Sequence, residues 1–167
     1  YISLASHGWR LSKDKLNTYY RAGLDKVNLS LDSWDEQEHD SNRKKTGAYK
    51  AVFETIDNCR DIGLDVSLSM FVSRGDTRSK GFLDAVEYSK RTKVRLFLKA
   101  ALPLGGFQGD DSKIIDDADR EIMERIHQQH SHITRDTHHG CGAMRTLVSI
   151  NPYGELMPCN SVHINIG

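Results

Sequence analysis

The sequence predicts an α/β fold in which part of a parallel-stranded barrel is followed by a small β-hairpin. Along the first 129 residues, the apolar pattern switches repeatedly between a period of two and a period of 3.6, which indicates strands alternating with helices. Each strand–helix unit takes about 30 residues, as expected for parallel strands joined by right-handed crossovers. Beyond residue 129 the alternation stops, so a separate C-terminal segment is expected.

Four apolar runs are expected to form the strands. They are Tyr1–Ala5, Lys26–Leu31, Val66–Val72 and Val94–Ala100, and the first is expected to be buried. A doubly wound sheet and an α/β barrel both fit such a series. Four strands are too few for a closed eight-stranded barrel of about 250 residues. We therefore expect the C-terminal portion of a partial (β/α)6-type barrel, with the rest upstream of Tyr1.

Four segments have the spacing of helices that bury one face. They are Ser12–Ala22, Ala48–Ile62, Lys80–Arg91 and Ile114–Gln129. Ser12 is suited to cap the first helix, and a glycine follows each of the first two. The polar stretch between the second strand and the second helix predicts a loop. The inward residues are expected to be Val52, Ile56, Cys59, Phe82, Ala85, Val86, Ile115, Ala118, Ile122, Met123 and Ile126.

The composition argues against several classes of partner. The 23 basic and 23 acidic residues cancel, which disfavours a general nucleic-acid or anionic-membrane binder. No apolar run approaches the roughly 20 residues of a membrane span. Three cysteines are a poor disulfide framework and fit a reducing, cytoplasmic setting. The chain opens in an apolar run without Met or a signal-peptide pattern, so we expect a fragment.

The tail combines a polar, histidine-rich linker over residues 130–140 with a hairpin over residues 141–167. Thr146–Ile150 and Glu155–Met157 are expected to form its strands around a turn at Gly154. Cys141 and Cys159 flank this hairpin in the pattern C-x12-G-x4-C, so their thiolates can converge on one metal. Two cysteines cannot complete a four-ligand site, and two free thiols remain the alternative.

Polar residues gather where the predicted strands end, which is where α/β barrels bind ligands. Ser30 and Asp32 alternate with leucines and therefore share one face, predicted to point into the barrel. Arg43 follows in a loop and is able to clamp a carboxylate. The alternatives are a capping role for Asp32 and a solvated surface position for Arg43. Ser6 and His7 end the first strand, and the glycine-bearing loop Leu102–Gly106 follows the fourth.

Two other features are interpreted as structural. Cys59 lies on an apolar helix face and is expected to be a core residue. The acidic run Asp116, Asp117, Asp119 and Glu121 is expected to be the solvated start of a helix, placed favourably by the helix dipole.

Three segments together resemble the radical S-adenosylmethionine (SAM) superfamily, in particular members with a SPASM or twitch C-terminal domain. ASHGW is similar to the family's TNG strand end. The stretch from Asn28 to Val66, NLSLDSW…GLDV, resembles the family's "vSlDg…Hd.iRg" region. GCGAMRTLVSINPYGELMPCNS is similar to the segment that opens SPASM and twitch domains. The resemblance spans nearly the whole chain.

The resemblance implies a set of site residues. Ser30 and Arg43 would hold the methionyl carboxylate of SAM, and Asp32 would lie in the same pocket, near the ribose or the substrate. The other implied contacts are Ser6 and His7 bordering SAM, Leu102 and Leu104 near its adenosine, and Cys141 and Cys159 on an auxiliary iron–sulfur cluster.

The resemblance also implies a reaction and its partners. A [4Fe–4S] cluster reduced by an external electron donor splits SAM into methionine and a 5′-deoxyadenosyl radical. That radical abstracts hydrogen from a peptide, a protein or a cofactor precursor. The family's CxxxCxxC motif is not in this sequence and is expected upstream, so we expect the chain by itself to be inactive.

Two alternatives to the radical SAM interpretation stay open at this point. One is a non-catalytic α/β module whose hairpin binds zinc for protein interaction. The other is an unrelated α/β-barrel enzyme that binds a phosphate-bearing ligand at its glycine loops. A CxxxCxxC motif upstream in the full reading frame would favour the radical enzyme.

Overall fold

A computed structural model describes residues 1–101, 109–135, 144, 148–151, 153–158 and 164–167. The chain divides into two compact units. One comprises Tyr1–Ala101 with Ser112–Asp136, and the other comprises Leu102–Asp111 with Thr137–Gly167. Among the described residues, no helix is both long and apolar enough to cross a lipid bilayer.

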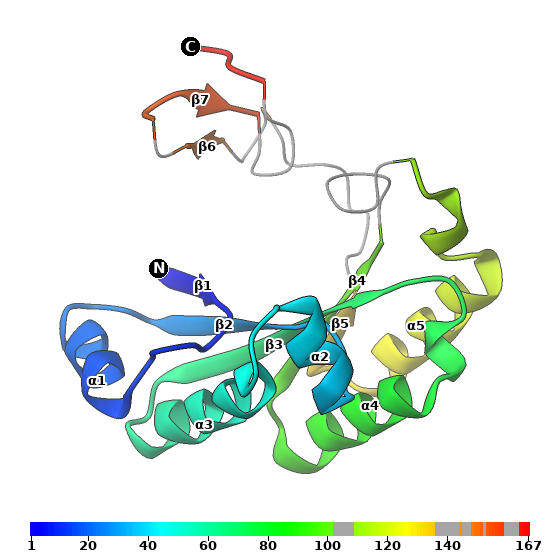
Figure 1. Cartoon of the computed structure of the whole chain (residues 1–167), viewed down its shortest axis with the longest axis horizontal. Coiled ribbons are helices and arrows are strands. Elements are labelled where there is room, and N and C mark those ends of the chain that lie inside the picture. Colours follow the sequence, from blue (N-terminus) through cyan, green and yellow to red (C-terminus); the bar gives the residue numbers. More distant parts are fainter. Residues whose placement is uncertain (102–108, 136–143, 145–147, 152, 159–163) are drawn as a thin grey trace. The chain divides into compact units, whose positions relative to one another are not determined.

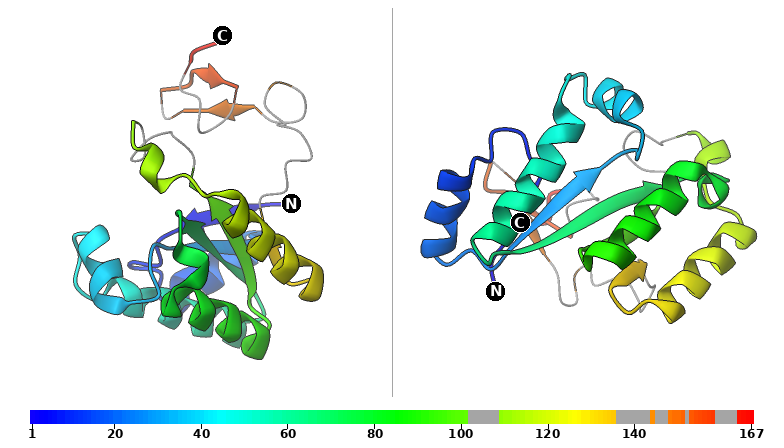
Figure 2. Two further views of the ribbon diagram at one scale, coloured as in Figure 1. Left: turned by 90° about the vertical axis from the view of Figure 1, so that its right-hand side faces the viewer. Right: turned by 90° about the horizontal axis from the view of Figure 1, so that it is seen from below.

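The first unit is built on a five-stranded, fully parallel sheet. Its strands are β1 (Ser3–Ser6), β2 (Lys26–Leu31), β3 (Asp65–Val72), β4 (Arg95–Ala100) and β5 (Ile133–Arg135). They lie side by side in chain order, β1-β2-β3-β4-β5. Helices α1, α3, α4 and α5 lie on the same face of the sheet (Figures 1 and 2). A doubly wound sheet carries helices on both faces, so the described residues do not have that architecture.

All helices of the described residues except the second, which was expected to be a loop, begin and end within three residues of the predicted positions. They are α1 (Lys13–Arg21), α2 (Glu36–Asn42), α3 (Ala48–Asp61), α4 (Lys80–Thr92) and α5 (Asp117–Gln129), with short 3₁₀ turns η1 (Asp76–Arg78) and η3 (Asp111–Lys113). Ser12 caps α1 as expected, because its side chain accepts a hydrogen bond from the amide of Lys15. Ser79 caps α4 in the same way.

The two faces of the sheet differ sharply in chemistry. Leu29, Leu68 and Leu96 stand in register on β2, β3 and β4, and each is at most 1% exposed. They form the core with the buried faces of α3, α4 and α5. The opposite face presents polar and charged side chains in register, such as Asn28 and Ser67. The strands are therefore amphipathic, and the helix-free face is suited to polar ligands.

Four expectations about individual elements are wrong. The first strand is an edge strand rather than a buried one, and Tyr1 before it is 90% exposed. The polar stretch after β2 contains helix α2, whose residues lack an apolar stripe. Residues 133–135 of the expected linker form β5, a strand too short to show a period. On α5, Ala118 is exposed and Asp119 occupies the inward position instead.

The second unit contains the predicted hairpin. Strands β6 (Ser149–Ile150) and β7 (Leu156–Met157) pair antiparallel. Gly154 has φ +85°, and its amide donates to the carbonyl of Asn151 at 3.0 Å. The side-chain oxygen of Asn151 accepts from the amide of Glu155 at 3.0 Å, which tightens the same turn.

Two neighbouring residues of α4 test the position of the core. Phe82 is 0% exposed and Leu83 is 54% exposed. We expect Phe82→Ala to lower the free energy of unfolding by about 3–5 kcal/mol, because it leaves a cavity. The control Leu83→Ala should change it by no more than about 0.5 kcal/mol. Denaturant unfolding measures both, and equal effects would contradict the assigned helix face.

Candidate functional site

The candidate site lies where the parallel strands end. Asp32 follows the last residue of β2, and Arg43 is the C-cap residue of α2. The structure brings these two predicted residues together, with Arg43 Nη2 2.5 Å from Asp32 Oδ1. Both side chains are roughly three-quarters buried. The Nε of Arg43 is also buried and has no hydrogen-bond partner among the described residues. The guanidinium is thus fixed on one side and has a free donor on another.

Ser30 lies on the predicted face. It pairs with Ser69 of β3 and Phe97 of β4 in register, on the side of the sheet opposite the core leucines. Its half-buried hydroxyl makes no hydrogen bond within the described part of the chain. Ser30 alternates with the buried Leu29 and Leu31 within β2, and Asp32 follows the strand in a bend.

His39 is a component of this site that the residue pattern did not single out. Its side chain is 0% exposed, and Nδ1 accepts a hydrogen bond from the amide of Asp32 at 3.1 Å. Burial lowers the pKa of His39, partly offset by the charge of Asp32, so the neutral form is favoured. An accepting Nδ1 places the proton of neutral imidazole on Nε2, a buried atom without a partner among the described residues. His39 therefore positions the backbone of Asp32.

A second α2 residue organises the loop after Arg43. Asp40 accepts hydrogen bonds from the amides of Gly47 at 2.5 Å and Tyr49 at 2.8 Å. These bonds, that of Tyr49 above all, hold the pKa of Asp40 below its ordinary value, although burial opposes them. The carboxylate thus joins α2 to the start of α3. This connection holds the loop that begins at Arg43.

The residues after β1 have local roles in the structure. Ser6 pairs in register with Leu29, so its side chain lies on the helix-covered side and not with Ser30. Its Oγ accepts from the amide of Gly8 at 3.1 Å, and His7 Nδ1 accepts from the amide of Trp9 at 3.2 Å. The structure therefore does not bring Ser6 and Ser30 onto one face.

Gly8 packs this loop directly against α3. It has φ +80°, and a β-carbon on it would lie 2.9 Å from the carbonyl oxygen of Ala51. Thr55 Oγ1 lies 3.2 Å from the carbonyl oxygen of Gly8, within hydrogen-bonding distance. Because both the backbone angle and the close approach exclude a side chain, only glycine fits here.

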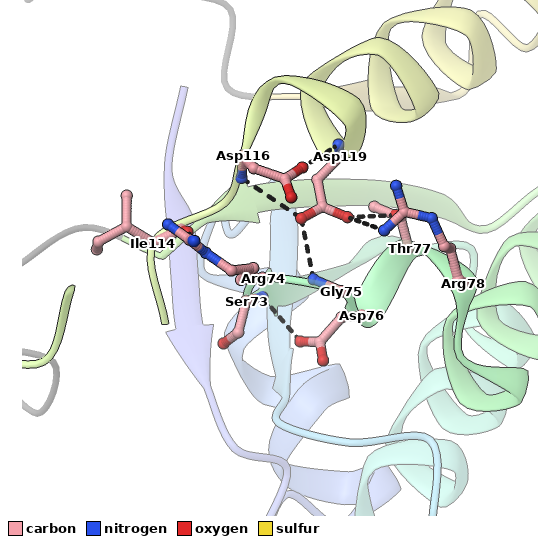
Figure 3. Close-up of polar contacts among 9 residues, drawn as sticks. All are labelled: Ser73, Arg74, Gly75, Asp76, Thr77, Arg78, Ile114, Asp116 and Asp119. Carbon is pink, nitrogen blue, oxygen red and sulfur yellow. Dashed lines mark hydrogen bonds and ion pairs between the residues drawn. The ribbon is translucent and has the colours of Figure 1, made fainter. Parts of the chain in front are cut away.

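The loop between β3 and α4 is held by one buried carboxylate, that of Asp119 (Figure 3). Its oxygens accept from the amide of Gly75 at 2.9 Å and from the hydroxyl of Thr77 at 2.5 Å. Arg78 Nη1 lies 3.6 Å from the same carboxylate. Burial raises the pKa of Asp119, but the hydrogen bonds and Arg78 outweigh this and bring the pKa below its ordinary value.

This finding corrects one expectation about the acidic run. Asp117 is solvated as predicted, with its side chain 99% exposed. Asp116 caps α5 in a reciprocal capping box with Asp119. Asp119 itself is fully buried, because within α5 it lies one helical turn before the core residue Met123.

Other predicted site residues lie outside the described residues, namely Leu102, Leu104, Cys141 and Cys159. Within the part that is described, no cluster of three or more His, Cys, Asp or Glu side chains could hold a metal ion. Cys59 is a core residue, as expected, and burial raises its pKa to about 11. A thiol with this pKa is a poor metal ligand at neutral pH.

Comparison with known proteins points to one family. The model of the radical SAM superfamily matches residues 1–87, more than half of the 167 residues. A GTP 3′,8-cyclase of Staphylococcus aureus (strain JH9) is 26% identical over 133 residues, which are 79% of this chain and 38% of that protein. The chain thus spans about two-fifths of the curated relatives it matches.

Solved structures show the same fold at low identity. Streptococcus suis SuiB bound to precursor peptide SuiA aligns with a TM-score of 0.72 at 13% identity, over 98% of this chain and 44% of that one. Native anSMEcpe with bound AdoMet aligns with a TM-score of 0.71 at 13% identity, over 95% of this chain and 50% of that one. At this identity the likeness concerns the fold.

Gly8→Ala tests the contact between the first loop and α3. A left-handed backbone costs alanine roughly 1–2 kcal/mol, and the clash with Ala51 should add about 1–3 kcal/mol. Gly23→Ala is the matched control, since Gly23 has φ +99° and no atom within 4 Å of its added β-carbon. Chemical denaturation should therefore show a larger loss at Gly8, and equal losses would refute the close approach.

Asp119→Asn tests the buried carboxylate. We expect a loss of about 1–3 kcal/mol at neutral pH, because charged hydrogen bonds to Gly75 and Thr77 are weakened. The folded pKa is below the ordinary value of 3.8, so the stabilisation is complete above about pH 4 and fades as the pH falls through the folded value. The free energies of unfolding of wild type and variant should therefore converge at acidic pH. The control Asp117→Asn should show little pH-dependent difference in thermal unfolding.

Proposed function

The chain belongs to the radical SAM superfamily, and on this premise we propose that it carries the SAM-carboxylate side of a radical SAM enzyme. In this family, SAM bound to a reduced [4Fe–4S] cluster is the source of the 5′-deoxyadenosyl radical that abstracts hydrogen from substrate. The observation that carries the proposal is the arrangement of Ser30, Asp32 and Arg43 at the end of β2.

The donor set fits the carboxylate of SAM. Ser30 has a hydroxyl without a partner among the described residues, and Arg43 has a buried, unpartnered Nε. A carboxylate accepts two parallel hydrogen bonds from a guanidinium, and a nearby hydroxyl can donate a third. Asp32 accepts a hydrogen bond from Nη2 of Arg43, so we assign Asp32 the role of positioning Arg43. The contact of Asp32 with the SAM ribose or the substrate, which the family resemblance implies, is a further role. His39 fixes the backbone of Asp32 by accepting the hydrogen bond of its amide.

The residues of this chain do not fit the radical-generating cluster. The sequence contains no CxxxCxxC motif, and Cys59 is buried in the core with a raised pKa. The cluster would accordingly be bound by residues outside this sequence, and the chain alone would be inactive. Cys141 and Cys159 remain the predicted ligands of an auxiliary cluster in a SPASM or twitch segment.

The sheet supports the interpretation as part of a barrel. In the described part of the chain, five parallel strands follow one another in chain order and α1, α3, α4 and α5 cover one face (Figure 2), as in an opened α/β barrel. The polar face of the sheet would then line the interior, where substrate meets SAM. For the substrate we propose a peptide, a protein side chain or a cofactor precursor, with electrons from an external donor.

Variants of the full-length protein test the SAM site. Arg43→Gln and Ser30→Ala should each weaken SAM binding about tenfold or more, since hydrogen bonds to charged groups contribute about 1.5–3 kcal/mol. Arg120→Gln is a control on the exposed side of α5, where Arg120 pairs with Asp117. Calorimetry measures SAM affinity, and chromatography measures 5′-deoxyadenosine after anaerobic reconstitution and reduction.

The metal content of the reconstituted protein distinguishes the enzyme from the zinc-binding alternative. Iron with acid-labile sulfide is expected for the radical enzyme. Zinc without sulfide, together with no measurable SAM binding, would contradict the proposal and favour a non-catalytic module.

A further inference from the structure

The helix-free face of the sheet contains a polar pocket that the SAM site does not use. Its volume is about 500 Å³. Three cations from β2 and β4 line it, and none of its lining residues is acidic. The lining residues are Tyr1, Ser3, Lys26, Asn28, Ser69, Arg95, Phe97 and Lys99.

The most deeply placed cation is Lys26. It is 6% exposed, and its Nζ lies 4.8 Å from the centre of the Phe97 ring. No carboxylate of the described residues forms an ion pair with Lys26, Arg95 or Lys99. A nearly buried ammonium without an ion pair is uncommon, because burial of an unpaired charge is costly.

The charges around the pocket favour an anionic ligand. Burial lowers the pKa of Lys26; the charge of Asp65 opposes this, and that of Arg95 adds to it. The floor between the cations consists of neutral groups that bond to one another. The side-chain amide nitrogen of Asn28 donates to the hydroxyl of Ser69 at 2.9 Å. The hydroxyl of Ser67 donates to the side-chain oxygen of Asn28 at 2.9 Å. The floor therefore supplies no negative charge.

We propose that this pocket binds an oxyanion group of the substrate. The inference rests on the proposed function, because it assigns the pocket to the substrate of that enzyme. Arg95 and Lys99 are four residues apart on β4, about 13 Å of strand, so they can hold separate oxygens of one extended group. Lys26 begins β2, whereas Asp32 follows its other end. The pocket extends along the same face to Ser69 and Phe97, the register partners of Ser30, so the anion would lie beside the SAM carboxylate site. Phosphate and carboxylate share this chemistry.

Binding measurements with the full-length protein test the pocket. Inorganic tripolyphosphate is the phosphate probe, and a short glutamate-containing peptide is the carboxylate probe, with its glutamine counterpart as the neutral reference. We expect saturable binding of at least one anionic probe by calorimetry, and the tighter one identifies the source. Lys26→Met and Arg95→Gln should each weaken that binding about tenfold or more.

Matched controls make the result decisive. Lys50→Gln removes one positive charge from a side chain that is 75% exposed on α3, so it should leave anion affinity unchanged. Equal weakening in all three variants, or no saturable binding to wild type, overturns the proposal. Arg95 is exposed, so Arg95→Gln keeps the test valid should Lys26→Met not fold.

SAM binding, measured on the same samples, separates this inference from the proposed function. A protein that binds SAM but neither anion contradicts the pocket alone. A protein that binds an anion at Lys26 and Arg95 but no SAM contradicts the radical SAM function.

Discussion

The structure depends on the in-register alternation of apolar and polar residues across its parallel strands. On β2, β3 and β4 the buried leucines, valines and Met70 point to one side, where they meet α3 and α4 and leave water together. Because strand side chains alternate, the same register places every intervening polar residue on the other side. Core formation and the polar face of the sheet are therefore two consequences of one pattern, and a one-residue slip in strand register would destroy both.

The loops at the carboxyl ends of the strands are held by polar side chains that accept backbone hydrogen bonds, and those of Asp119 and His39 are fully buried. Asp119 holds the loop after β3, Asp40 holds the loop after α2, and His39 holds the backbone of Asp32. Each accepts hydrogen bonds from backbone amides that would otherwise be unsatisfied. Loops held in this way place Asp32 and Arg43 at fixed positions, which a site for a charged ligand requires.

Prediction from the sequence was accurate where periodicity was strong. The strand Lys26–Leu31 and the buried face of α3 were assigned correctly, because alternation and helical spacing are local properties. It was wrong where an element is short or polar: α2 has no apolar stripe and β5 has only three residues. The pairing of Asp32 with Arg43 agrees with the expected common site, whereas Ser6 lies on the other side of the sheet.

The sequence by itself determined the alternation of elements, most of the buried helix residues and the position of Ser30 on the face opposite the core leucines. These follow from periods of two and 3.6, which a single segment expresses without its neighbours. Only the tertiary structure decided that Asp119 is a buried anchor, that His39 supports Asp32, and that Lys26, Arg95 and Lys99 line one pocket. These groups are distant along the chain, and their proximity arises from strand register and helix packing, which no local pattern encodes.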